Sequence, residues 1–188
     1  MPFAVPPVIS VDHFARFGLP RRYALDLKAL DQAYERLSFE HHPDFLAAAA
    51  ADEKQRAEQA AAELNEAYRS LRSEPERAAY LLGLLARDAQ REGKVPAVWQ
   101  PNREALPPGF LQEMFRLQEE VDEAKGEAAQ LLRSQINAHR LALVGARLSL
   151  FERAQSELDA DTLQTLQSVL NQEQYLLRLL ERLDGRNA

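Results

Sequence analysis

The sequence feature that most limits the fold is a helix stop in the stretch SFEHHPDFL, residues 38–46. Both flanks have helical spacing, but Pro43 disfavours the helical conformation at His42. The first helix should therefore end at about His41, and the next helical spacing covers residues 53–72. Two long helices with a short connection are expected to form an antiparallel hairpin. The stretch contains neither Gly nor Asn, which a simple turn would favour, so its residue types need another explanation.

The hairpin is expected to have shorter helices at both ends. Asp26 is the expected N-cap of the first long helix. Asp52 is a candidate N-cap of the second, and the alternative is that the alanine run before Asp52 joins that helix. A short helical turn should form within residues 10–22, where Phe14, Phe17 and Leu19 anchor it, and a short apolar helix should follow Pro75. All of these segments are helical, and we predict no strand among them.

A break in composition divides the chain. Residues 88–109 contain four of the ten prolines and two of the seven glycines, which is typical of a linker. Three helices follow, at about 110–125, 126–155 and 159–184, and their short connections predict an antiparallel bundle. The predicted organisation is a flexible lead (1–9), a helical-hairpin domain (10–87), a linker (88–109) and a three-helix bundle (110–188).

Composition excludes several classes of function. The chain has no cysteine, which removes disulfides, thiol nucleophiles and thiolate metal sites and fits a reducing cytoplasm. Its net charge is −6, and without a sustained basic run a nucleic-acid surface is not indicated. No uninterrupted apolar window reaches the length of a membrane-spanning helix. We therefore expect a cytoplasmic protein that binds neither nucleic acid nor membrane and, since no long heptad seam is present, a monomer.

No catalytic or metal constellation is evident. Adjacent histidines on a helix point about 100° apart, so the pair before Pro43 is poorly placed to share a metal ion. An alternative of another class is a helical-bundle enzyme that uses Glu113, Glu119, Glu120 and His139 as metal ligands. Di-iron bundles need a Glu-x-x-His spacing on two helices, and the sequence lacks such a pair. We predict no enzyme activity, no cofactor and no metal.

The helix that begins at Phe110 has more apolar surface than one narrow face needs. Phe110, Met114 and Val121 belong to one stripe that can face a bundle core. Leu111 and Phe115 form a second apolar pair, rotated by about 100° from the first. Two interpretations stay open at this point, a wide core face or an exposed patch that awaits a partner.

The tripeptide of His42, Pro43 and Asp44 at the tip of a helical hairpin resembles the signature of a J-domain, the co-chaperone module that docks on DnaK-type ATPases. The segment LNEAYRSL (64–71) resembles the third helix of that module. Four further segments resemble the HscB family, the J-proteins of iron–sulfur cluster assembly, and extend the resemblance over residues 11–184. They are VDHFARFGLP, LDLKALDQAYERL, RAAYLLGL and PGFLQEMFRLQEEVDEA.

The resemblance implies an all-α, L-shaped, two-domain co-chaperone without catalytic residues. Its J-domain would stimulate ATP hydrolysis by an HscA/DnaK-type chaperone, and its bundle would hold an IscU-type iron–sulfur scaffold protein for cluster transfer. The residues that the resemblance assigns to chaperone binding are His42, Pro43, Asp44, Arg36, Lys28, Arg21 and Arg22. Those assigned to scaffold binding are Leu111, Gln112, Phe115, Glu119 and Tyr175.

The charge of the hairpin departs from the J-domain pattern. A J-domain should present positive charge near its tripeptide, but residues 26–41 have four acidic and two basic side chains, a net charge of −2. Two alternatives therefore stay open beside the leading hypothesis. One is a general J-protein that serves a broad DnaK-type chaperone. The other is a J-like adaptor that binds a partner without stimulating any ATPase.

Overall fold

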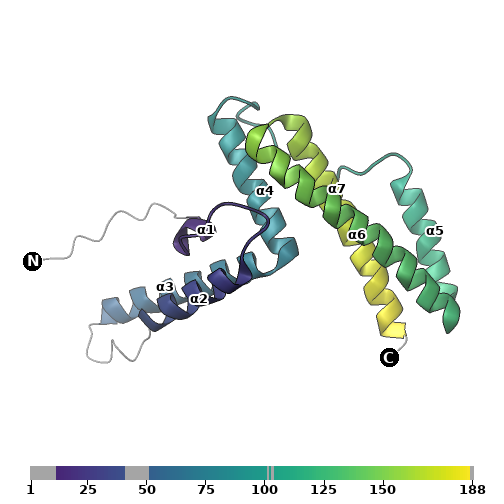
Figure 1. The fold of residues 1–188 in the computed structure, drawn as a ribbon, viewed down its shortest axis with the longest axis horizontal. Helices are drawn as coiled ribbons and strands as arrows, with labels where there is room; N and C mark the ends of the chain where they lie inside the picture. The colour runs from purple at the N-terminus through teal and green to yellow at the C-terminus, as the bar shows by residue number, and fades with distance from the viewer. Residues whose placement is uncertain (1–11, 41–50, 101, 103, 187–188) are drawn as a thin grey trace, which may run out of the picture. The chain divides into compact units, whose positions relative to one another are not determined.

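The structure, a computed structural model, is all-helical, which confirms the predicted fold class (Figure 1). It describes residues 12–40, 51–100, 102 and 104–186, and these form seven α-helices and no strand. The chain divides into two compact units, Met1–Tyr80 and Leu81–Ala188.

The N-terminal unit begins with a short helix, α1 (His13–Arg16), that packs through Phe14. Asp12 caps α1 by accepting a hydrogen bond from the Ala15 amide at 3.0 Å. The chain then turns at Gly18, whose φ of 67° lies in the left-handed region that glycine adopts without a steric penalty. Phe14 and Phe17 are both buried, so this segment is anchored to the unit as predicted.

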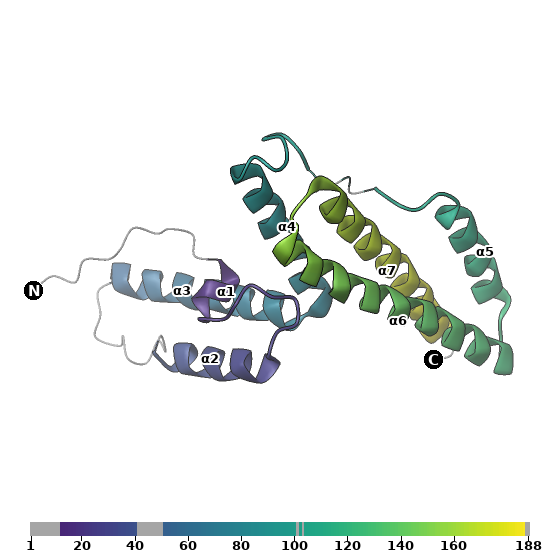
Figure 2. The same cartoon turned by 45° about the horizontal axis from the view of Figure 1, so that its top comes forward.

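Helices α2 (Leu27–Glu40) and α3 (Ala51–Arg72) form the predicted hairpin and lie side by side in both ribbon views (Figures 1 and 2). Asp26 is the N-cap of α2, because its carboxylate accepts hydrogen bonds from the amides of Lys28 and Ala29. The expectation for Asp52 is wrong. Helix α3 already includes Ala51, so Asp52 lies in its first turn and is not the N-cap. At that position its negative charge interacts favourably with the positive end of the helix dipole.

A polar and aromatic network joins the two long helices. Tyr34 stacks on Tyr68 with ring centroids 4.1 Å apart. The Tyr34 hydroxyl donates to Asn65 at 2.6 Å, and the Tyr68 hydroxyl donates to Asp31 at 2.9 Å. Asp31 also accepts from Arg72. Partners from later positions of α2 pair with earlier positions of α3, so the helices are antiparallel.

Helix α4 (Glu74–Arg91) begins beside the hairpin, and Arg77 attaches its start. Arg77 is buried, donates to the carbonyls of Tyr23 and Leu71, and lies 5.2 Å from the Tyr23 ring. The helix runs to Arg91, past the residues that we expected to be helical. Ala89 is fully buried near that end, and such burial stabilises a helix beyond its local sequence preference.

Three helices make the core of the C-terminal unit. They are α5 (Phe110–Glu123), α6 (Glu127–Ser156) and α7 (Ala160–Arg186), close to the bounds that we predicted. Their shared core is formed by aliphatic and aromatic side chains from all three helices. The largest of these core residues are Phe110, Met114, Leu132, Ile136, Leu143, Leu176, Leu179 and Leu183.

The hairpin of α6 and α7 also contains a buried ion pair that the sequence did not reveal. Arg147 of α6 is fully buried and pairs with Glu173 of α7, and Arg140 lies 3.9 Å from the same carboxylate. An exposed pair, Arg133 with Asp184, joins the other end of the two helices. The earlier arginine of α6 pairs with the later acidic residue of α7, and the later arginine pairs with the earlier acidic residue. Helices α6 and α7 are therefore antiparallel.

Candidate functional site

The residues predicted for chaperone binding divide into two groups. His42, Pro43 and Asp44 lie outside the described residues. Lys28 and Arg36 are exposed on α2, where both are open to a partner.

The two remaining basic residues of this group, Arg21 and Arg22, are exposed just before α2. Arg21 is paired, because its guanidinium donates two hydrogen bonds to Asp12 at 2.7 and 2.5 Å. Burial alone would raise the pKa of Asp12, but the Ala15 amide and the Arg21 guanidinium outweigh it and hold the pKa below its usual value. Part of the expected positive charge is thus neutralised within the unit.

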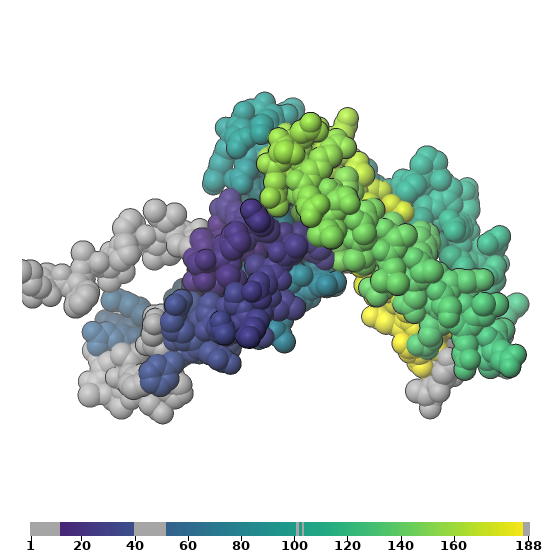
Figure 3. Space-filling view, in the orientation of Figure 1, coloured from purple at the N-terminus to yellow at the C-terminus, as the bar shows by residue number. Residues whose placement is uncertain are grey.

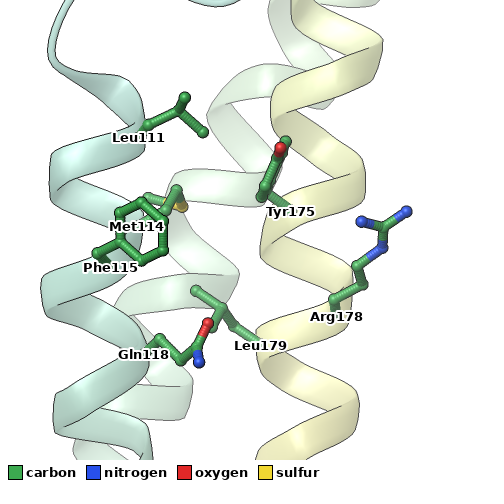
Figure 4. Close-up of a pocket in the computed structure, with 7 residues that line it drawn as sticks. All are labelled: Leu111, Met114, Phe115, Gln118, Tyr175, Arg178 and Leu179. Carbon is green, nitrogen blue, oxygen red and sulfur yellow. The ribbon is translucent and has the colours of Figure 1, made fainter. Parts of the chain in front are cut away.

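Three of the five residues predicted for scaffold binding line a groove between α5 and α7 (Figure 4). Leu111 and Phe115 lie on the α5 side, and Tyr175 faces them from α7. The side chains of Leu111 and Phe115 stay 44% and 65% exposed, whereas Phe110 and Met114 are buried in the core. Of the two interpretations of α5, the structure therefore supports the exposed patch.

Contacts at both ends of the groove hold its two helices together. Phe110 of α5 meets Tyr175 of α7 edge to face, with ring centroids 5.8 Å apart. Further along, Arg182 of α7 makes a bidentate ion pair with Asp122 of α5 at 2.6 and 2.7 Å. Because two independent contacts set the spacing of α5 and α7, the groove is formed before any partner arrives.

The groove suits one apolar side chain of a partner. Its floor is made by Met114 and Leu179, which are both buried, and its volume is about 160 Å³. A cavity of about 150 Å³ accepts a benzene ring, so an aromatic or branched aliphatic side chain fits this space. The polar groups at its edge belong to Gln118 and Arg178.

The structure brings together some of the predicted residues and not others. Leu111, Phe115 and Tyr175 line the groove, whereas Gln112 and Glu119 are exposed outside its lining. The residues that sequence reasoning did not assign to the site are Met114, Gln118, Arg178 and Leu179. Helical spacing contained a signal for them, because they lie three or four residues from Leu111, Phe115 or Tyr175 on the same helices.

Two features are absent from the described residues. No group of three or more His, Asp or Glu side chains there is placed to hold a metal ion, and this includes the described members of the Glu113, Glu119, Glu120 and His139 set. None of the helices in that part of the chain is long and apolar enough to cross a membrane.

The fold matches that of co-chaperones with solved structures. Chaperone HscB from Vibrio cholerae superposes with a TM-score of 0.72 at 23% identity, over 94% of this chain and 97% of that one. Human co-chaperone protein HscB gives a TM-score of 0.76 at 24% identity, over 98% of this chain and 85% of that one. At these identities the likeness establishes the fold alone, an all-helical architecture.

Sequence relatives establish the family. The HscB homologue of Bordetella pertussis is 38% identical over 134 residues, 70% of this chain and 74% of that protein. The homologue of Burkholderia mallei is 37% identical over 143 residues, 72% and 77% of the two chains. That of Cupriavidus taiwanensis is 42% identical over 118 residues, which span 63% of this chain and 62% of that protein. No protein-family model matches the sequence. The chain belongs to the HscB family of co-chaperones.

Proposed function

We propose that this co-chaperone docks on an HscA/DnaK-type ATPase through His42, Pro43 and Asp44, stimulates ATP hydrolysis, and delivers an IscU-type scaffold protein for iron–sulfur cluster transfer. In this proposal the N-terminal unit contains the J-domain, and the groove between α5 and α7 binds the scaffold protein. Membership of the HscB family supports both assignments.

The observation on which the proposal mainly rests is the exposed groove. Leu111 and Phe115 keep large apolar areas in contact with water although α5 buries a complete core stripe beside them. Exposed apolar side chains that gather around a preformed pocket mark an interaction site. Two predicted binding residues from α5 and one from α7 meet there, which supports a scaffold-binding role.

The hairpin supports the chaperone-binding part of the proposal. The Tyr34–Tyr68 stack and the Asp31–Arg72 pair tie α2 to α3. A rigid hairpin presents the exposed Lys28 and Arg36 of α2 on a defined surface, and such basic groups suit an acidic partner surface.

The test is single-turnover ATP hydrolysis by a purified HscA-type chaperone, with and without this protein and with and without an IscU-type scaffold. We expect stimulation by this protein that rises further with the scaffold. His42→Gln should abolish the stimulation, whereas His139→Gln, the same substitution on α6, should leave it unchanged. Equal stimulation by wild type and His42→Gln would contradict the docking role of the tripeptide.

One observation favours a second candidate, a J-like adaptor that binds the scaffold without stimulating an ATPase. Residues 26–41 have a net charge of −2, and Arg21 is paired with Asp12 inside its own unit. Both facts weaken attraction to an acidic chaperone. Binding of the scaffold without any ATPase stimulation would select this candidate over the first.

A further inference from the structure

Arg178 stands apart from the other lining residues of the groove. It is exposed on the α7 side (Figure 4), and its guanidinium carbon lies 5.8 Å from the centre of the Tyr175 ring. The other lining residues are mainly apolar, and none of them has a formal charge. A single formal charge therefore lies at the edge of an apolar pocket.

The other arginines described on α5, α6 and α7 have acidic partners. Every arginine of α5, α6 and α7 whose side chain is described has a carboxylate within 4.0 Å, with the exception of Arg178. The paired residues are Arg116, Arg133, Arg140, Arg147, Arg153 and Arg182. Among these described arginines of the three helices, Arg178 at the groove is therefore the one whose guanidinium is available for an external carboxylate.

The contact with Tyr175 prepares that guanidinium for binding. A guanidinium held against an aromatic ring gains a cation–π attraction and loses some of its freedom before a partner arrives. The planar fork can still donate two parallel hydrogen bonds to a carboxylate. Figure 4 shows the guanidinium on the side of α7 turned away from α5, so a carboxylate bound to it lies beyond Tyr175, beside the edge of the groove.

We infer that Arg178 is a specificity-determining residue of the groove, and that it selects a partner surface on which an aspartate or glutamate neighbours the inserted apolar side chain. This inference rests on the scaffold-binding role proposed above and adds the chemistry of the partner. The apolar pocket supplies affinity, and Arg178 supplies charge discrimination, since a basic residue at the same place is repelled.

The experiment measures binding of a purified IscU-type scaffold protein by calorimetric titration at low and at high ionic strength. The variants are Arg178→Glu, Arg178→Lys and, as a matched control, Arg116→Glu. The control makes the same change of charge on an exposed arginine of α5 that lies outside the groove lining. Thermal melting followed by circular dichroism checks that each variant is folded.

We expect Arg178→Glu to bind roughly tenfold more weakly than Arg116→Glu at low ionic strength, with a smaller difference at high salt because screening weakens the interaction. Arg178→Lys should lose less, because it keeps the charge and gives up the bidentate geometry. In a charge-reversal scan of the scaffold, one Asp or Glu to Arg change should restore binding to Arg178→Glu.

Two failures can be told apart. If wild type does not bind the scaffold, the proposed function of the groove is wrong and this inference falls with it. If wild type binds, Leu111→Ala plus Phe115→Ala does not, and Arg178→Glu binds as well as Arg116→Glu, then the groove is the site and only the role of Arg178 is overturned. If no Asp or Glu to Arg change in the scaffold restores binding to Arg178→Glu, the proposed role of Arg178 is likewise overturned.

Discussion

Removal of the two exposed apolar side chains of α5 tests the scaffold-binding groove most directly. The variant is Leu111→Ala plus Phe115→Ala. A phenylalanine buries about 150–250 Å² when fully covered, and the Phe115 side chain is 65% exposed. A partner can therefore cover about 100–160 Å² of it, worth about 2.5–4 kcal/mol at about 25 cal/mol per Å².

Only part of that energy appears as affinity, because ordering and desolvation at an interface oppose it. We therefore expect the double variant to lose about 2–3 kcal/mol of binding free energy, or roughly 30- to 150-fold in affinity for the scaffold protein. Basal stimulation of the ATPase without scaffold should not change, because the groove lies outside the N-terminal unit.

The chain offers a closely matched control. Leu131 and Leu141 of α6, which forms the front of the C-terminal unit in Figure 3, are 63% and 60% exposed and do not line the groove. Leu131→Ala plus Leu141→Ala removes similar exposed apolar area, so it should bind the scaffold like wild type. Isothermal titration of both double variants is the measurement.

Stability must be followed in parallel. Exposed substitutions usually change the free energy of unfolding by about 0.5 kcal/mol or less, so the groove variant should melt close to wild type. Unchanged scaffold affinity in a folded groove variant would refute the assignment. An equal loss in the α6 control would instead show that exposed apolar area in general, and not the groove, accounts for binding.

Two further predictions concern the interior and the N-terminal unit. Glu173→Ala should lower the free energy of unfolding by about 3–5 kcal/mol, because it leaves the buried Arg147 charge without its carboxylate. Urea denaturation measures this, and Arg147→Met plus Glu173→Leu should recover most of the loss; a small effect of Glu173→Ala would contradict the buried pair. The second prediction concerns His13, whose ring stacks on Tyr80 with centroids 4.1 Å apart. Burial lowers the pKa of His13 below 6.5; the nearby Arg16 also lowers this pKa, whereas Glu66 raises it. The unfolded chain therefore binds the proton more readily than the folded chain does. Stability from this group is present above pH 6.5 and is lost as the pH falls below 6.5 toward the folded pKa. The melting temperature should therefore fall between about pH 7.5 and about pH 5.5, and an identical fall in His13→Gln would exclude this cause.

Local sequence signals predicted the helices of the C-terminal unit well. The three predicted ranges differ from α5, α6 and α7 by at most two residues at any end. Pro and Gly mark the connections, and apolar spacing marks the helical faces, so these bounds depend on neighbours in the chain. The end of α4 differed because burial of Ala89, a tertiary contact, extends that helix to Arg91.

The rotation of α7 about its own axis is a feature that local sequence signals do not predict. The segment YLLRLLERL contains adjacent leucines, and either member of each pair can face the core. The structure buries Leu176 and Leu179, whereas Leu177 and Leu180 are partly buried. This choice places Leu179 on the floor of the groove, and it depends on how α7 is rotated against α5 and α6.

The sequence by itself determined an all-helical chain, a hairpin of two long helices, and the residue types from which a groove can be built. Backbone restriction at proline and helical periodicity act over a few residues, which is why sequence alone revealed them. Only the tertiary structure decided that Leu111 and Phe115 face solvent, that Arg147 and Glu173 meet in the interior, and that Arg178 lacks an acidic partner among the described residues. Each of these facts depends on which side chain a second helix presents, and that is set by the packing of residues far apart in the chain.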